Sequence, residues 1–251
     1  MNQQNKKKNI MEFKIRCSAI SDIMAEPRNK SELLSEGAKT YCKKYVKEYL
    51  FGRREVVKSK YIEKGLETEE QGLNLIVRVL KLGMIYKNEE RKTDEYKTGE
   101  VDFIHDGIIY DNKASYSIDT FPMFDDKLDP KYYAQMQGYL SLWGLNKSRV
   151  CYTLVDTPMD ILERELKWIE DENEKQRKAL NHVFTEKYWK EVKKNLFPNA
   201  ESIKFVSIED KHRLKVFEVE RDDNFINKIN IKSKLCNEYC NELIKKHGNS
   251  N

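Results

Sequence analysis

The stretch that decides the fold is Gly99-Glu100-Val101-Asp102-Phe103, followed by the turn His105-Asp106-Gly107 and by Ile108-Ile109-Tyr110-Asp111-Asn112-Lys113-Ala114-Ser115. Asp-Gly favours tight hairpins, so two short antiparallel strands are predicted on either side of this dipeptide. Side chains alternate between the faces of a strand, which places Asp111, Lys113 and Ser115 on one face. Asp102 lies opposite them if the strands pair. The stretch therefore predicts two carboxylates and an amine in one place.

Two carboxylates and a lysine suit the metal-dependent cleavage of a phosphodiester bond. This reaction needs neutralised charge at the phosphate, a nucleophilic water and help for the leaving oxygen. Mg²⁺ prefers oxygen ligands, so we expect it to bind Asp102, Asp111 and the backbone carbonyl of Asn112. Lys113 would orient or deprotonate the attacking water. The alternative is a surface hairpin in which Asp111 and Lys113 form an ordinary ion pair.

A third carboxylate interrupts the apolar stripe of a helix predicted over 61–87. The stripe recurs at three- and four-residue steps and consists of Ile62, Leu66, Leu73, Ile76 and Leu80. Glu69 occupies a position of this stripe that should face the core, where an unpaired carboxylate is costly. Either Glu69 is a buried metal ligand, or the helix is rotated so that Glu69 lies at the edge of the stripe. Periodicity does not decide between them.

A second helix is predicted to begin at Asp129-Pro130, because an N-cap residue followed by proline is typical of a helix start. We expect this helix to run to about Trp143. Gln135 and Tyr139 are four residues apart and therefore share a face. This face either looks into a site beside the sheet or is a polar flank in water.

The remaining segments predict an α/β protein with a central mixed sheet flanked by helices. They are an extended piece entering a helical turn over 13–24, capped by Ser18 or Ser21; a helix over 30–50; a strand over 148–155 covered on both faces; a long charged helical region from Thr157-Pro158 to about 195; two strands over 203–208 and 213–219; and a helix over 224–246. Residues 1–10 are polar and are predicted to form a flexible tail. No linker or repeat interrupts the rest, so residues 11–251 are predicted to form a single domain.

Composition sets broader limits on the class of protein. The 251 residues are 39% hydrophobic and 35% charged, which is typical of a folded domain rather than a disordered chain. The net charge of +4 is compatible with a nucleic-acid partner but does not require one. No window approaches the roughly 18 apolar residues of a membrane helix, so we expect a cytoplasmic protein. The five scattered cysteines indicate reduced thiols rather than an iron–sulfur site, because the late pair Cys236 and Cys240 lacks a third member.

These segments resemble the PD-(D/E)xK nuclease superfamily, in particular its branch of lambda-type exonucleases, YqaJ-like viral recombinases and RecB-type nuclease domains. The segments that carry the resemblance are the Gly-x-x-x-Glu motif of Gly65–Glu69, the two catalytic strands around Asp102 and Asp111-Asn112-Lys113, the Gln-x-x-x-Tyr helix of Gln135–Tyr139, and the C-terminal ending Phe217–Asp223. The sequence departs from the branch at three positions. Val101 replaces the name-giving proline, Asp111 replaces a glutamate, and Asn112 is polar where an apolar side chain usually packs.

The resemblance implies a restriction-endonuclease-like core with helical C-terminal additions, two Mg²⁺ or Mn²⁺ ions, and hydrolysis of DNA ends. It assigns the metal to Glu69, Asp102, Asp111 and Asn112, with Lys113 and Gln135 as further catalytic residues. Ser115 and Tyr139 would contact the substrate, and Arg16 and Ser21 match positions that hold a 5′ phosphate.

We therefore expect a DNA exonuclease of phage recombination or replication. Its expected partners are a single-strand annealing or recombination protein and further copies of the chain, as in a trimer. The alternatives are a structure-specific or restriction-like endonuclease, and a non-catalytic module that binds DNA or protein.

Overall fold

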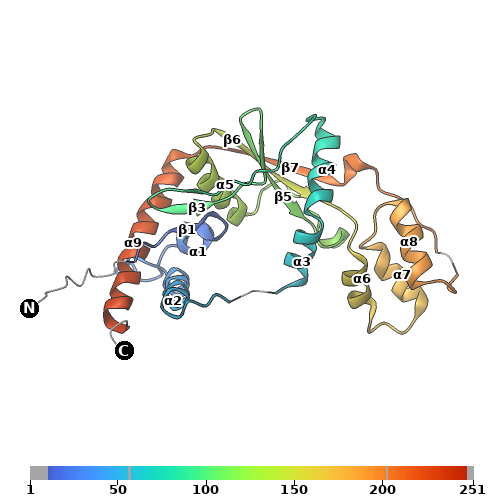
Figure 1. The fold of residues 1–251 in the computed structure, drawn as a ribbon, viewed down its shortest axis with the longest axis horizontal. Coiled ribbons are helices and arrows are strands. Elements are labelled where there is room, and N and C mark those ends of the chain that lie inside the picture. The colour runs from blue at the N-terminus through green and yellow to red at the C-terminus, as the bar shows by residue number, and fades with distance from the viewer. Residues whose placement is uncertain (1–10, 56–57, 202, 248–251) are drawn as a thin grey trace, which may run out of the picture.

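The computed structural model describes residues 11–55, 58–201 and 203–247 (Figure 1), so the predicted tail over 1–10 lies outside the described residues. The helices are α1 (Ile20–Met24), α2 (Glu36–Phe51), α3 (Lys60–Glu67), α4 (Glu69–Leu80), α5 (Pro130–Trp143), α6 (Met159–Leu166), α7 (Glu172–Leu180), α8 (Glu186–Leu196) and α9 (Asp223–His247). The strands are β1 (Ile15–Arg16), β2 (Lys92–Thr93), β3 (Lys97–Gly99), β4 (Phe103–His105), β5 (Ile108–Ala114), β6 (Lys147–Thr153) and β7 (Leu214–Glu220).

A mixed four-stranded sheet forms the centre of the molecule, with the strand order β4-β5-β6-β7. β5 and β6 are parallel, whereas β4 and β7 pair antiparallel to their neighbours. A smaller sheet has the order β1-β3-β2. The predicted α/β architecture with a central mixed sheet and flanking helices is therefore confirmed, with α6 to α9 as the helical C-terminal additions (Figure 1).

The hairpin predicted around Asp106-Gly107 is present. Both turn residues have positive φ angles, 49° for Asp106 and 74° for Gly107, as the turns that match strand twist require. Phe103 pairs with Tyr110 in the antiparallel register, so the next position outward sets Asp102 opposite Asp111. The turn thus fixes which residues of the two strands meet.

The two faces of the central sheet are covered by different helices. On one face, Leu73 and Ile76 of α4 pack with Tyr110. On the other face, Met136 of α5 packs with Ile109. Because neighbouring residues of β5 point to opposite faces, this strand is sandwiched between α4 and α5. Buried Val150 and Cys151 of β6 confirm the prediction of a strand covered on both faces.

The helix predicted over 61–87 is wrong as one element, because the chain breaks at Thr68 into α3 and α4. The Thr68 hydroxyl donates to the backbone carbonyl of Lys64 (2.7 Å) at this break. The predicted stripe is therefore discontinuous. Leu73 and Ile76 are buried as expected, but Ile62 and Leu66 of α3 are 47% and 72% exposed.

The charged helical region predicted after Thr157 is present and consists of three helices, α6, α7 and α8. Asp171 is the N-cap of α7 and accepts from the Glu174 backbone N–H (2.7 Å), so a new helix begins here. α6, α7 and α8 enclose a core of their own around Trp189. Residues 203–208, predicted as a strand, run without a strand partner: Phe205 stacks on Trp189 with ring centroids 5.4 Å apart.

The proposed capping roles of several residues also need correction. Neither Ser18 nor Ser21 caps the first helical turns, because the N-cap positions belong to Arg16 and Ala19 and carry no side-chain cap. α6 also begins without a side-chain cap: Pro158 holds its N-cap position, and the Thr157 hydroxyl lies 3.4 Å from His182 Nδ1. Asp129, in contrast, caps α5 as predicted by accepting from the Lys131 N–H (2.9 Å).

All five cysteines are buried and free of disulfides. Three of them lie where α2 packs on α9, with the Cys42 thiol directed at the Cys236 carbonyl and the Cys240 thiol at the Cys42 carbonyl (both 3.9 Å). None of the helices in the described part of the chain is long and apolar enough to cross a membrane.

We predict opposite effects of alanine at two helical glycines. A Cβ at Gly138 of α5 would lie 2.4 Å from Ile20 Cδ1 and 2.8 Å from Cys17 Sγ, whereas one at Gly65 of α3 meets nothing within 4 Å. Gly138→Ala should lower the free energy of unfolding by about 1–3 kcal/mol through overpacking. Gly65→Ala should raise it by up to about 1 kcal/mol through helix propensity. Urea titrations followed by circular dichroism measure both, and a stabilising Gly138→Ala would contradict the close packing.

Candidate active site

β5 brings an acid and a base together at the predicted place. Asp111 is only 2% exposed, and Lys113 Nζ lies 2.5 Å from its Oδ2. Asp102 faces this pair from the other arm of the hairpin, and its Oδ2 accepts from the Asn112 backbone N–H (2.6 Å). The hairpin thus holds both carboxylates and the amine in one site, as the sequence predicted.

α5 adds an amide and a phenol to the same site. Gln135 Nε2 donates to Asp111 Oδ1 (3.3 Å) and to the Tyr139 hydroxyl (2.9 Å). The face of α5 that carries Gln135 and Tyr139 therefore looks into the site rather than into water. The Tyr139 ring packs against Gly99, where a Cβ would come within 2.6 Å of Cε1. Glycine at position 99 lets α5 approach close enough for Gln135 to reach Asp111.

The pKa values in the site are shifted because Asp102 and Asp111 carry like charges and lie close together, away from bulk water. Burial, and then the charge of Asp111, raise the pKa of Asp102 to about 7. Burial also disfavours the charged form of Lys113, but the attraction to Asp111 outweighs burial, and the pKa of Lys113 is raised. Lys113 is therefore a cation in this arrangement. Asp111 Oδ2 nevertheless makes no well-directed hydrogen bond, despite its contact with the ammonium.

Glu69 is the first residue of α4 and lies at the rim of the site. The break at Thr68 takes Glu69 out of any core-facing stripe, and its side chain, 32% exposed, pairs with Lys87 Nζ (2.8 Å). Its charge contributes to the raised pKa of Asp102. Glu69 is therefore near the carboxylate pair but is engaged with a lysine.

A cavity of about 940 Å³ opens over these groups. Its wall includes Glu69, Asp102, Lys113 and Ser115 together with the exposed apolar face of α3. The Ser115 hydroxyl is buried and has no hydrogen-bond partner among the described residues.

Sequence reasoning missed Tyr132, which lines this cavity and lies under Lys113, with Nζ 4.9 Å from the ring centroid. The spacing in the sequence could have identified Tyr132. It precedes Gln135 by three residues and Tyr139 by seven, so the three side chains share one face of α5.

Asn112 turns its side chain to the opposite face of the sheet. Its Oδ1 accepts from the Thr153 hydroxyl (2.7 Å), and its amide packs so closely on α4 that a Cβ at Gly72 would lie 2.3 Å from Nδ2. This explains how a polar residue is accommodated beneath the site. The backbone of Asn112 remains beside Asp102, through the N–H bond.

Three predicted substrate residues are not part of the cavity wall. Arg16 pairs with Glu48 on α2 (3.1 Å), and Ser21 lies in α1. Neither of them, nor Tyr139, lines the cavity over the carboxylates. Their roles in phosphate or substrate binding stay predictions.

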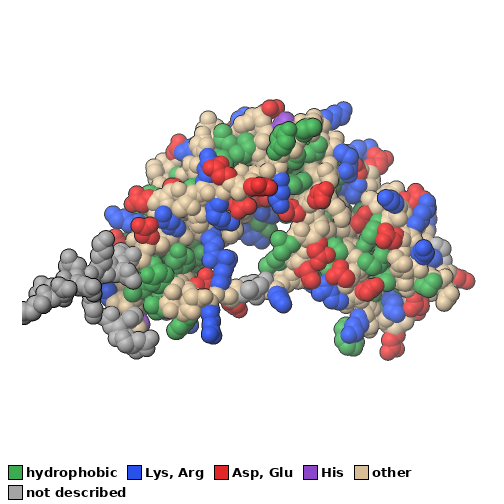
Figure 2. Space-filling view, viewed as in Figure 1, with side chains coloured by type: hydrophobic (Ala, Val, Ile, Leu, Met, Phe, Trp, Pro, Cys, Tyr) green, Lys and Arg blue, Asp and Glu red, His purple; other side chains and the backbone are tan. Residues whose placement is uncertain are grey.

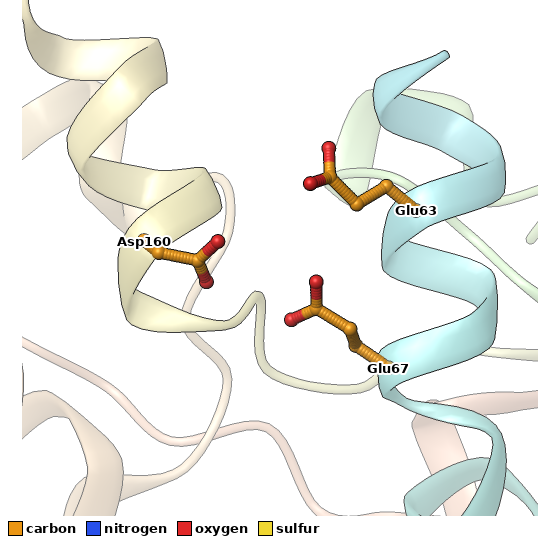
Figure 3. Close-up of side chains that lie close together, drawn as sticks. All are labelled: Glu63, Glu67 and Asp160. Carbon is orange, nitrogen blue, oxygen red and sulfur yellow. The ribbon is translucent and has the colours of Figure 1, made fainter. Parts of the chain in front are cut away.

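A separate acidic group lies between α3 and α6 (Figure 3). Carboxylate oxygens of Glu63, Glu67 and Asp160 lie within 4.8 Å of one another. Arg164 pairs with Glu63 (2.8 Å) and with Asp160 (3.1 Å). The guanidinium offsets the charge of the group, which is therefore an exposed ion-pair network that joins the two helices.

Comparisons with known proteins place this arrangement among nucleases. No model of a known family matches the sequence, and no curated protein matches it. The structure is similar to that of a phage-related exonuclease from Haemophilus somnus 129PT, with 26% identity, a TM-score of 0.75, and coverage of 95% of this chain and 98% of the other. It is also similar to an alkaline exonuclease from Laribacter hongkongensis, with 14% identity, a TM-score of 0.58, and coverage of 94% and 93%.

The mixed sheet flanked by helices fits a restriction-endonuclease-like core, and the exonuclease neighbours support a nuclease. The structural neighbours of this chain are a phage-related exonuclease and an alkaline exonuclease, which agrees with the resemblance of its motifs to the lambda-exonuclease/YqaJ branch of the PD-(D/E)xK superfamily.

We predict that Asp102→Asn stabilises the metal-free protein at about pH 8. The pKa of Asp102 is raised, so ionisation of this residue destabilises the folded state as the pH rises through about 7. Asparagine keeps an acceptor for the Asn112 N–H without the charge. The free energy of unfolding should rise by on the order of 2 kcal/mol at about pH 8, and the gain should shrink toward about pH 4, because the destabilisation builds up between the ordinary pKa of aspartate and about 7.

Thermal unfolding in EDTA at the two pH values measures this effect. Asp126→Asn, at an exposed position of the loop before α5, is the matched control and should change stability at neither pH. Equal or lower stability of Asp102→Asn at about pH 8 would contradict the repulsion between the two carboxylates.

Proposed function

We propose that this protein is a metal-dependent deoxyribonuclease that acts as an exonuclease on the ends of duplex DNA, in the recombination or replication of a phage or mobile element. One observation carries the proposal. Asp102 and Lys113 line an open cavity beside the buried Asp111, in a fold shared with a phage-related exonuclease. DNA as substrate is supported by the neighbours, since one crystal structure of the Laribacter exonuclease is a complex with dAMP.

A divalent cation fits the residues of this site. Asp111 Oδ2 is buried without a well-directed hydrogen bond, and Asp102 beside it has a raised pKa, so a bound cation would offset the repulsion between them. In this proposal Mg²⁺ or Mn²⁺ is held by Asp102, Asp111 and the backbone carbonyl of Asn112, with Glu69 as a further ligand once it leaves Lys87. The ion would supply Lewis acidity toward the phosphate and a lowered pKa of water.

The side chains around the carboxylates have distinct tasks. Lys113 is cationic and sits beside Asp111, where its ammonium can orient the attacking water and offset charge that develops on the phosphate. Gln135 donates to Asp111 Oδ1 and so directs the other carboxylate oxygen away from α5. The Tyr139 hydroxyl accepts from the Gln135 amide, so Tyr139 acts as a positioning residue for Gln135. Ser115 and Tyr132 line the wall that the substrate would touch.

We further propose that residues 11–251 act as one nuclease domain, with α6 to α8 as an addition that has a small core of its own. This addition is joined to the catalytic half at Tyr116, which follows β5. The Tyr116 carbonyl accepts from Lys64 Nζ of α3 (2.9 Å) and lies 3.2 Å from His182 Nδ1. The predicted oligomer and the recombination partner stay predictions.

Lys113→Met should reduce the degradation of linear duplex DNA in Mg²⁺ by at least about 100-fold, because the cation beside the reacting phosphate is lost. Release of acid-soluble nucleotides measures the rate, and chelation by EDTA should abolish it in the wild type. Lys187→Met on α8 is the matched control, since Lys187 is exposed and far along the chain from the site. Undiminished activity of a folded Lys113→Met protein would refute the role given to the lysine.

Linear and covalently closed forms of one plasmid separate the two nuclease classes. An exonuclease that needs ends should degrade the linear form completely and leave the closed circle intact on an agarose gel. Cutting of the closed circle would instead favour the endonuclease alternative. If neither Mg²⁺ nor Mn²⁺ supports cleavage of any linear or single-stranded DNA, the protein is a binding module that retains the fold.

A further inference from the structure

Residues 43–54 form a basic segment of the chain. Residues 43–54 contain five basic residues (Lys43, Lys44, Lys47, Arg53 and Arg54) and one acidic residue (Glu48), a net charge of +4. The whole chain has 46 basic and 42 acidic residues, which is also +4. This short segment therefore carries a net charge equal to that of the whole chain.

Within this segment the basic side chains share one face of α2. Thr40, Lys43, Lys44 and Lys47 follow the i, i+3, i+4, i+7 pattern of a single helical face. A different face of α2, which carries the buried Cys42, packs against α9. The three lysines are exposed, and Arg53 lies just past the helix end, also exposed. We call Lys43, Lys44, Lys47 and Arg53 the α2 basic face.

The α2 basic face lines a concave surface. A hollow of about 790 Å³ is bounded by its four residues together with Thr40, Glu48, Phe51 and Glu55. The two acids are already engaged, since Glu48 pairs with Arg16 (3.1 Å) and Glu55 with Lys44 (2.9 Å). Lys43, Lys47 and Arg53 form no ion pair with any carboxylate of the described residues. Three cations thus remain without counter-charge at one hollow.

This hollow lies on α2, and the space-filling view shows an opening between the half of the molecule that carries α2 and the half that carries α3 (Figure 2). α2 stands on one side of the opening and α3 on the other (Figure 1), and α3 forms part of the wall of the active-site cavity. Lys and Arg side chains border the α2 side of the opening in the space-filling view (Figure 2). A polyanion that extends from the cavity across the opening would therefore meet the α2 basic face.

We propose that the α2 basic face binds the sugar–phosphate backbone of the DNA whose end lies at the Asp102–Asp111 site. This inference rests on the proposed function and adds a second contact region to it. Unpaired lysines bind phosphates by releasing condensed counterions, an interaction that depends on salt and carries no sequence information. The face therefore holds the DNA in place without reading its bases.

The test is the salt dependence of DNA binding without chemistry. A fluorescently labelled duplex is titrated with protein in EDTA at several salt concentrations, and the slope of log K against log salt is taken. For Lys43→Ala/Lys47→Ala we expect weaker binding and a slope shallower by about 1.8, that is, two phosphate contacts at about 0.9 each. Two duplexes of unrelated sequence should show the same change. Thermal unfolding confirms that the variant is folded.

The matched control is Lys187→Ala/Lys194→Ala on α8, which removes two exposed lysines and the same net charge. This control should keep the wild-type slope. In Mg²⁺, the α2 variant should raise KM for linear duplex and leave kcat unchanged, since the contact is remote from the reacting phosphate.

Equal slopes for the α2 variant and the control would overturn the inference, as would a wild-type protein with no measurable affinity for the duplex. Failure of the proposed function has a different signature. A wild type that binds DNA with the expected slopes but never cleaves it would refute the nuclease proposal and leave the α2 basic face as a DNA-binding surface.

Discussion

Two neighbouring carboxylates, the buried Asp111 and the half-buried Asp102, are the constraint on which the rest of this structure depends. Asp102 and Asp111 face each other across a hairpin in surroundings that exclude most water, so their charges repel strongly. The neighbouring groups reduce the cost of this arrangement. The Lys113 ammonium contacts one carboxylate, the Asn112 N–H donates to the other, and Gln135 donates to Asp111. The remaining repulsion is what makes the site receptive to a cation.

The fold holds these groups by packing from two sides. α5 carries Gln135 to Asp111, and it can do so because Gly99 and Gly138 leave no side chain between α5 and its neighbours. α4 approaches the other face of β5 through Gly72, where the Asn112 amide fits against the bare backbone. Close-packed interiors transmit small changes, so the geometry of the site depends on these contacts as much as on its charged residues.

The parts of the fold that the sequence predicted correctly share one property: their signals lie within a few residues of one another. Asp106-Gly107 specified the hairpin, and Asp129-Pro130 specified the start of α5. The spacing of Gln135 and Tyr139 then identified the face that reaches the carboxylates. Turn and cap preferences are properties of local backbone conformation, so they survive in any tertiary context that does not oppose them.

The sequence by itself therefore determined the hairpin, the strand register that opposes Asp102 to Asp111, and the helix that supports them. Only the tertiary structure decided which amphipathic face meets a core. Because the helix breaks at Thr68, Leu66 is exposed and Glu69 forms an ion pair with Lys87. The periodicity of the sequence predicts neither outcome. The physical reason is that burial depends on partners distant in sequence. A three- or four-residue repeat shows that a face is apolar, but the element that packs on it, or leaves it open to a cavity, is supplied by the rest of the chain.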